Sequence, residues 1–130
     1  MESVDSMAAM CWSLYGFATC YELTGDDRYL ETAELHAQFY IDHAAPDGVP
    51  PWDYDAPAEG KLSVRQPDSS AAAIAAVGLA NLARWTTDRI RPRVYRDMAL
   101  RIVNTLTQAP YLGSDDPKWE GILKRGVYHI

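Results

Sequence analysis

The chain has 130 residues, of which 48% are hydrophobic and 23% charged, a balance typical of one globular domain rather than of a disordered segment. Its formal net charge of −6 and its scattered basic residues argue against nucleic acid or an anionic membrane surface as a partner, because phosphate binding needs clustered Lys and Arg. No apolar run approaches the roughly 20 residues that span a bilayer, and the N-terminus lacks the basic residues of a secretory signal, so a cytoplasmic location is the default expectation.

Two helices are predicted in the first part of the chain, separated by Thr24 and Gly25. Asp26 or Asp27 is expected to cap the second helix, and residues 46–48 end it. On each helix, apolar residues recur at a spacing of three and four, which marks one buried face. These residues are Met7, Met10, Cys11, Leu14, Phe17, Ala18 and Tyr21 on the first helix, and Leu30, Ala33, Ala37, Tyr40, Ile41 and Ala44 on the second.

Two more helices are predicted after residue 67. Asp68, Ser69 and Ser70 are candidate caps for the third, which carries alanine on every face and is therefore expected to be the innermost helix. The fourth begins near Pro92 and stops at Pro110. Its apolar stripe is Val94, Met98, Ile102 and Leu106.

The predicted fold is all-α, a single partial domain made of two helical hairpins. The first hairpin covers about residues 6–44 and the second about 68–108. A long loop, 45–67, joins them, and an irregular tail, 109–130, follows. The loop is over-long for a compact domain and is therefore a candidate for function, and the tail is expected to be truncated.

The loop contains the stretch "VPPWDYDAPAEG". It suits a rigid corner, a sugar-binding platform or a carboxylate pair, since Asp53 and Asp55 would point the same way on an extended backbone. Because Asp side chains commonly bond their own backbone in turns, we favour a corner fixed by these residues. Trp52 and Tyr54 are then expected to pack on neighbouring helices.

No metal or cofactor site is predicted from the motifs. Cys11 and Cys20 fall on opposite faces of one helix, too far apart to form a disulfide, and are expected to be small buried residues. His36 and His43 are seven positions apart and lack a Cys, Asp or Glu to complete a ligand set, so a solvated or rim position is expected. No phosphate-binding loop or Ser-His-Asp order is present.

Three stretches in order resemble the C-terminal part of unsaturated glucuronyl hydrolases, which are six-hairpin α/α-toroid glycosidases. They are "WSLYGFATCYELTGDDRYLETAE", then "DGVPPWDYDAP" followed by "DSSAAAIAAVGLANLAR", and "EGILKRGVYH". The resemblance implies that two of six hairpins are present here. It also implies that an aspartic acid outside these residues protonates the double bond of a 4,5-unsaturated uronic acid, to which water then adds. We therefore expect the isolated chain to be inactive and assign no catalytic residue within it.

The family's motif of Trp, Ser or Thr, Arg, Gly, Gln, Ala and Trp aligns with residues 6–12, of which Trp12 alone is retained. The resemblance implies that Trp12 stacks on a sugar, and a core or rim position is an equal alternative. Ala8 stands in place of the family's arginine, so a cation suited to a uronate carboxylate is missing there. Asp68 is expected to be a helix cap first and a cavity-lining, substrate-binding residue second.

The expected function is that of a C-terminal segment of a glycosidase in polysaccharide degradation, with a uronic-acid oligosaccharide as partner and no cofactor, metal, nucleic acid or membrane. The alternative is a non-enzymatic helical module, or gene relic, that self-associates through the exposed edges of its hairpins.

Overall fold

The computed structural model describes residues 7–51 and 66–127. These residues form four α-helices, α1 (Met7–Thr24), α2 (Asp27–Asp42), α3 (Ser69–Trp85) and α4 (Arg91–Leu106), and one 3-10 turn, η1 (Gly113–Asp115). Within the same residues, extended pairing is limited to isolated bridges. The predicted all-α class with two helical hairpins is confirmed.

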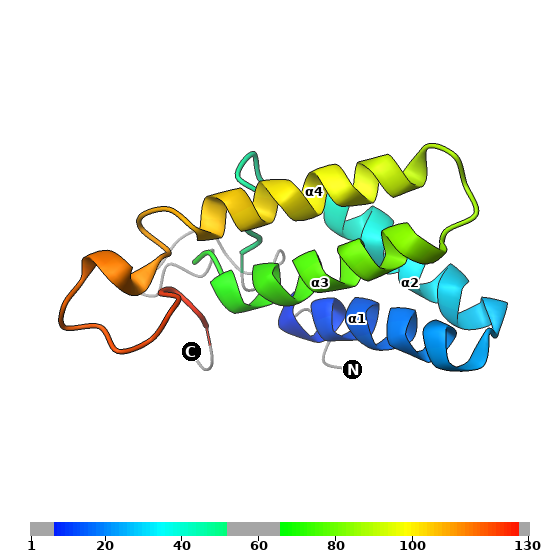
Figure 1. The fold of residues 1–130 in the computed structure, drawn as a ribbon, viewed down its shortest axis with the longest axis horizontal. Coiled ribbons are helices and arrows are strands. Elements are labelled where there is room, and N and C mark those ends of the chain that lie inside the picture. The colour runs from blue at the N-terminus through cyan, green and yellow to red at the C-terminus, as the bar shows by residue number, and fades with distance from the viewer. Residues whose placement is uncertain (1–6, 52–65, 128–130) are drawn as a thin grey trace.

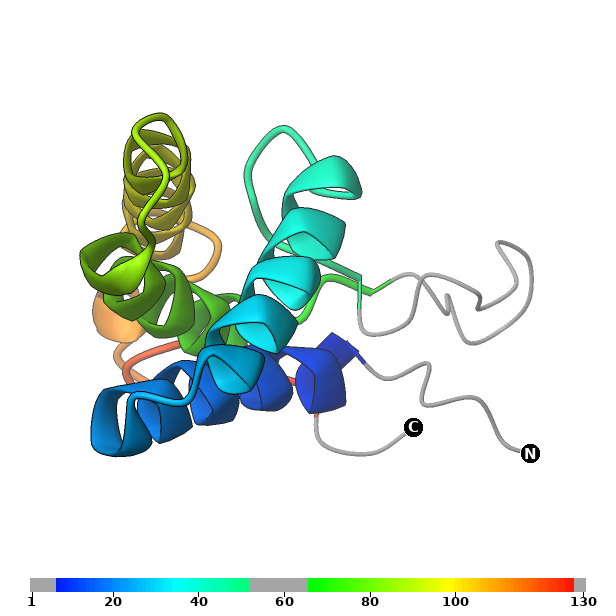
Figure 2. The ribbon, with the colours of Figure 1, turned by 90° about the vertical axis from the view of Figure 1, so that its right-hand side faces the viewer.

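The four helices lie in two layers. α1 and α3 run parallel and pack side by side, and α2 and α4 return in the opposite direction (Figure 1). Figure 2 shows α2 and α4 rising apart from each other above α1 and α3. α3 contacts each of the other three helices, which confirms its prediction as the innermost helix.

Local sequence explains where the helices begin and end. Gly25, just past α1, has a φ of +69°, a left-handed conformation that glycine adopts at low cost. The carboxylate of Asp26 accepts a hydrogen bond from the backbone N–H of Arg28 and caps α2. Pro92 lies in the first turn of α4, where its missing N–H costs nothing. These ends agree with those expected from the sequence.

The predicted stripe of α4 is wrong at one position. Val94 is 39% exposed, whereas Tyr95 is 1% exposed and belongs to the core. Both residues fall within one helical turn of Met98, so the spacing alone does not distinguish them. In the structure the larger ring of Tyr95 fills the space beside the inner helix, and Val94 faces outward.

α1 and α3 approach each other closely at Gly78. A Cβ atom at this position would lie 3.0 Å from Cγ of Leu14 and 3.3 Å from the backbone nitrogen of Tyr15. The glycine therefore allows the backbones of α1 and α3 to approach each other more closely than any larger residue would. α1 and α3 run in the same direction, so their N-terminal ends lie toward the same end of the molecule (Figure 1).

The segment after α4 is folded back on itself rather than irregular throughout. Leu112 and Leu123 form an antiparallel bridge, and the N–H of Gly113 donates to the carbonyl of Ile122 at 2.7 Å. The N–H of Lys124 donates to the carbonyl of Tyr111, also at 2.7 Å. We call residues 111–125 the tail hairpin. The proposed division of the chain into a single partial domain stays a prediction.

Among the described residues, no helix combines the length and the apolar character needed to cross a bilayer.

Candidate functional site

The ends of three chain segments meet where α1 and α3 begin. The long loop leaves this end at Pro51 and returns to it at Pro67, and these two prolines form an antiparallel bridge. The N–H of Asp68 donates to the carbonyl of Pro50 at 2.8 Å. This bond holds the segment that ends the loop against the segment that begins it. The tail hairpin reaches the same end (Figure 1). We call this end of the molecule the loop end.

Asp68 is the buried polar centre of the loop end, since it is only 1% exposed. Its Oδ1 accepts hydrogen bonds from the N–H of Ser70 at 3.0 Å and of Ala71 at 3.4 Å, and from the hydroxyl of Ser70 at 2.6 Å. It also accepts one from the N–H of Val127 at 3.1 Å. The expected helix cap is therefore confirmed. A direct contact between Asp68 and substrate stays a prediction.

Ser69 provides a second connection between α3 and the tail. Its hydroxyl donates to the carbonyl of Lys124 at 2.6 Å, and its N–H donates to the carbonyl of Arg125 at 3.1 Å. Together with the bond from Asp68 to Val127, these contacts hold residues 124–127 over the start of α3. We call this set of contacts the α3–tail clasp. The sequence analysis did not find it, because its partners are more than 50 residues apart in the chain.

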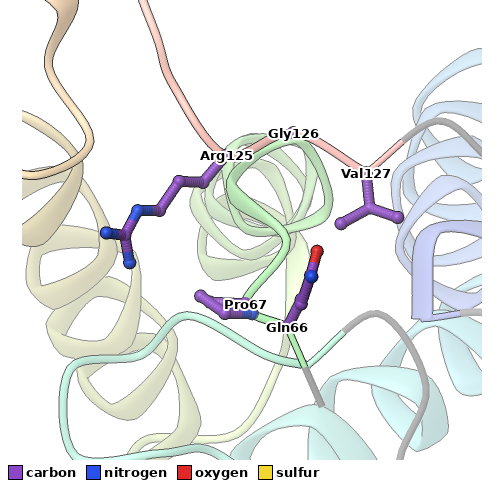
Figure 3. Close-up of a pocket in the computed structure, with 5 residues that line it drawn as sticks. All are labelled: Gln66, Pro67, Arg125, Gly126 and Val127. Carbon is purple, nitrogen blue, oxygen red and sulfur yellow. The ribbon is translucent and has the colours of Figure 1, made fainter. Parts of the chain in front are cut away.

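A pocket of about 340 Å³ lies beside the α3–tail clasp (Figure 3). Its walls are Gln66 and Pro67 from the returning loop strand, and Arg125, Gly126 and Val127 from the tail. Arg125 has a φ of +64°, which is unusual for a residue with a side chain, and its guanidinium carbon lies 6.0 Å from the centroid of the Tyr111 ring.

Trp12 lies in the second turn of α1 and is 58% exposed. Trp12 therefore lies outside the core of the described residues, and the rim alternative stays open. Its ring meets that of Tyr15 edge to face, with centroids 6.1 Å apart, and this contact limits its orientation. An exposed, oriented indole can stack on a sugar ring, but the role of Trp12 in binding stays a prediction.

The thiol of Cys11 is buried at the same end of the molecule. Burial raises its pKa to about 12, and the nearby carboxylate of Asp68 acts in the same direction. A thiol that stays protonated at neutral pH is a poor nucleophile and a poor metal ligand. Both cysteines are free, as expected, although Cys20 is only partly buried.

The two histidines differ in their surroundings. His43 is exposed at the end of α2, as expected, whereas the Nδ1 of His36 is buried without a hydrogen-bond partner among the described residues. No group of three metal-ligating side chains is found in the part of the chain that the structure describes. Trp52, Asp53, Tyr54 and Asp55 lie outside the described residues, so their expected roles stay predictions.

No protein-family model matches the chain. An unsaturated glucuronyl hydrolase of Bacillus sp. strain GL1 is 35% identical over 119 residues, which are 92% of this chain and 31% of the relative. One from Formosa agariphila is 37% identical over 106 residues, which are 80% of this chain and 25% of the relative. The crystal structure of the Bacillus enzyme superimposes on 95% of this chain and 32% of its own, with a TM-score of 0.82.

The chain matches one part of the length of unsaturated glucuronyl hydrolases. It spans about a quarter to a third of the length of the curated relatives. A crystal structure of an unsaturated glucuronyl hydrolase specific for heparin agrees, at 31% identity and a TM-score of 0.83 over 94% of this chain and 32% of that one. A share of 32% is close to what two hairpins out of six would supply.

Proposed function

We propose that this chain forms two of the six helical hairpins of an unsaturated glucuronyl hydrolase-like glycosidase. The observation that carries the proposal is the likeness to the Bacillus enzyme, with 35% identity and a TM-score of 0.82 over 95% of this chain. The proposed reaction is hydration of the 4,5-double bond of unsaturated uronic-acid oligosaccharides during polysaccharide degradation. A cytoplasmic location, without cofactor or metal, stays part of this proposal.

The proton donor of the reaction is proposed to lie outside this chain. A general acid needs a carboxyl group with a raised pKa at the reacting bond. Among the described residues, every carboxyl with a resolved shift, namely Asp26, Asp88 and Asp116, has a pKa lowered by hydrogen bonds from neighbouring residues. These carboxylates suit the ionised state rather than proton donation.

Within the proposed site, Trp12 supplies an aromatic surface for the sugar, and Asp68 holds the tail in place. The exposed indole of Trp12 offers its apolar area to the carbon–hydrogen face of a pyranose ring. The carboxylate of Asp68 already accepts four hydrogen bonds, so its contribution is to hold the tail at the loop end.

A chimera tests the proposal. The third of the Bacillus enzyme that this chain matches is replaced by the 130 residues, and turnover of a 4,5-unsaturated disaccharide is followed by loss of the double bond's ultraviolet absorbance. We expect the chimera to turn the substrate over and the isolated chain to show no turnover. Trp12→Ala in the chimera is expected to lower kcat/KM by about two- to tenfold, the size of a lost aromatic contact.

Leu23→Ala is the matched control, because Leu23 is also exposed, at 80%, on the same helix but in its last turn, away from the loop end. It is expected to leave kcat/KM unchanged. A chimera that folds, as judged by circular dichroism, but shows no turnover would contradict the proposed function. Turnover by the isolated chain would contradict the placement of the proton donor.

An alternative function is supported by the exposure of large apolar residues on the outer helices. Leu35 of α2 is 70% exposed and Leu100 of α4 is 65% exposed. Exposed apolar side chains of this size promote association when they gather on one surface. In this alternative the chain is an interaction module whose hairpin edges pair with a second copy.

A further inference from the structure

The pocket at the loop end contains two polar side chains that can bind a ligand directly. Gln66 extends upward beside Val127, whereas Arg125 extends away from Gln66 on the other side of Pro67 (Figure 3). A volume of about 340 Å³ lies at the lower end of the range for small-molecule pockets, about 300–1,000 Å³. The pocket therefore suits a ligand of about one sugar residue.

The guanidinium of Arg125 has no carboxylate partner among the described residues. Its neighbour Lys124 differs, because the Lys124 ammonium is 3.0 Å from the carboxylate of Asp116. The guanidinium of Arg125 lies over the Tyr111 ring, 6.0 Å from its centroid, which leaves the planar edge of the guanidinium available for hydrogen bonds. An exposed guanidinium held on an aromatic ring is a suitable partner for a carboxylate.

The backbone fixes the place of Arg125. The carbonyl of Arg125 accepts a hydrogen bond from the N–H of Ser69, and the carbonyl of Lys124, one residue before it, accepts one from the Ser69 hydroxyl. These bonds maintain the left-handed conformation of Arg125, whose φ is +64°. The side chain consequently starts from a fixed point, which lowers the entropy lost when it binds a ligand.

The inner helices contribute no cation near this pocket. α1 contains no Lys or Arg, since Ala8 stands where the resemblance implies an arginine, and α3 contains only Arg84, in its last turn at the far end. A uronate carboxylate bound at the loop end would therefore need a cation from another segment. Arg125 is such a cation.

We propose that Arg125 and Gln66 form a carboxylate-binding site for the uronate group of an acidic sugar. The guanidinium of Arg125 donates two hydrogen bonds to the carboxylate, and the amide of Gln66 donates to a carboxylate or hydroxyl oxygen on the other side. The nearby carboxylate of Asp68 opposes an anion here, and its four hydrogen-bond donors and the start of α3 offset part of its negative charge. The class of ligand, a uronic acid, rests on the proposed function.

Binding of D-glucuronate and D-glucose to the 130-residue chain tests this site, with nuclear magnetic resonance titration as the readout. We expect shifts in the amide signals of Gly126 and Val127 with glucuronate and much weaker binding of glucose. Arg125→Asn is expected to weaken glucuronate binding at least tenfold, because it removes the charged fork. Asparagine tolerates a positive φ, so the clasp is expected to stay folded.

Arg93→Asn is the matched control, since Arg93 is exposed on α4 and pairs with Asp97. It is expected to leave glucuronate binding unchanged. Arg125→Lys keeps the charge but not the fork, so an intermediate affinity is expected. This variant also covers the case in which Arg125→Asn fails to fold.

Three results would overturn the inference: equal affinity for the two sugars, glucuronate binding that survives Arg125→Asn, or no binding of glucuronate. The turnover of the chimera is measured separately and tests the proposed function, so it can succeed even if one of these three results is obtained. Conversely, an inactive but folded chimera together with Arg125-dependent glucuronate binding would contradict the proposed function and support this site.

Discussion

Asp68 joins donors from two distant parts of the chain through one buried carboxylate. Replacement by alanine leaves the partly buried N–H groups of Ser70 and Val127 without their acceptor. The loss of a helix cap and of a buried acceptor is expected to lower the free energy of unfolding by about 2–4 kcal/mol. Urea denaturation measures this change, and Asp68→Asn, which keeps one oxygen acceptor, is expected to cost less.

Asp26→Ala is the control for the Asp68 substitution. Asp26 caps α2 but is partly exposed, and among the described residues its side chain bonds only to Arg28. Its loss is expected to cost clearly less than the loss of Asp68, because water can replace the acceptor of an exposed cap. Amide exchange adds a second readout, since the Val127 N–H should lose protection in Asp68→Ala alone. Equal effects of the two substitutions would show that the contact with Val127 contributes nothing.

His36 makes stability depend on pH. Its ring packs against Phe17, with centroids 6.1 Å apart, and burial lowers its pKa below the usual 6.5. Below pH 6.5 the unfolded chain therefore binds more protons at this residue than the folded chain, so stability falls as the pH decreases from 6.5 toward the lowered pKa. His36→Phe, which cannot be protonated, is expected to reduce the loss of stability between pH 7 and pH 5.

The same substitution at His43 controls for the loss of an exposed histidine. The carboxyls of Asp26, Asp88 and Asp116 also have lowered pKa values, but aspartates titrate near pH 4 and below, outside this window. Thermal melts at pH 7, 6 and 5 provide the measurement. If the pH dependence of His36→Phe matched that of the unchanged chain, the effect would have to come from another group.

At the scale of the helices, two glycines in similar positions are expected to respond in opposite ways. Gly16 of α1 has no atom within 4 Å of where a Cβ would lie, so Gly16→Ala should stabilise the chain by about 0.5–1 kcal/mol through helix propensity. Gly78→Ala gains the same propensity but forces a Cβ against the backbone of Tyr15. We expect a net loss of about 1 kcal/mol, because backbone atoms in a packed helix cannot move away easily.

Thermal or urea unfolding of both variants compares the two directly. Stabilisation by Gly78→Ala would mean that α1 and α3 can separate slightly without cost. Their parallel packing would then rest on the surrounding alanine contacts rather than on the close approach at Gly78.

The helices could be predicted from the sequence because their signals are local. Asp26, Gly25 and Pro92 each lie within a few residues of the helix end that they define. On α4 the sequence predicted Val94 to be buried, but the structure buries Tyr95 instead. Periodicity indicates which side of a helix is buried, but it does not choose between adjacent residues. The α3–tail clasp and the pocket were missed for a different reason, since Ser69 and Lys124 are 55 residues apart and no spacing rule relates them.

At the scale of the whole molecule, the exposed apolar residues of α2 and α4 predict association. We expect the 14.5 kDa chain to show a mass above that of a monomer at high concentration in size-exclusion chromatography with light scattering. Leu35→Lys together with Leu100→Lys is expected to restore the monomer. Ala80→Lys, an exposed position on α3, is the control. A monomer at every concentration would contradict the interaction-module alternative.

The α3–tail clasp also bears on the order of folding. Asp68 and Val127 are 59 residues apart, so closing this contact costs more loop-closure entropy than the local contacts within the helices, which are expected to form first. The contacts of the tail should therefore form last during folding and break first during unfolding. Because Arg125 and Gly126 reach the pocket only when the clasp is closed, any ligand of the pocket would bind the closed form alone and slow the opening of the tail.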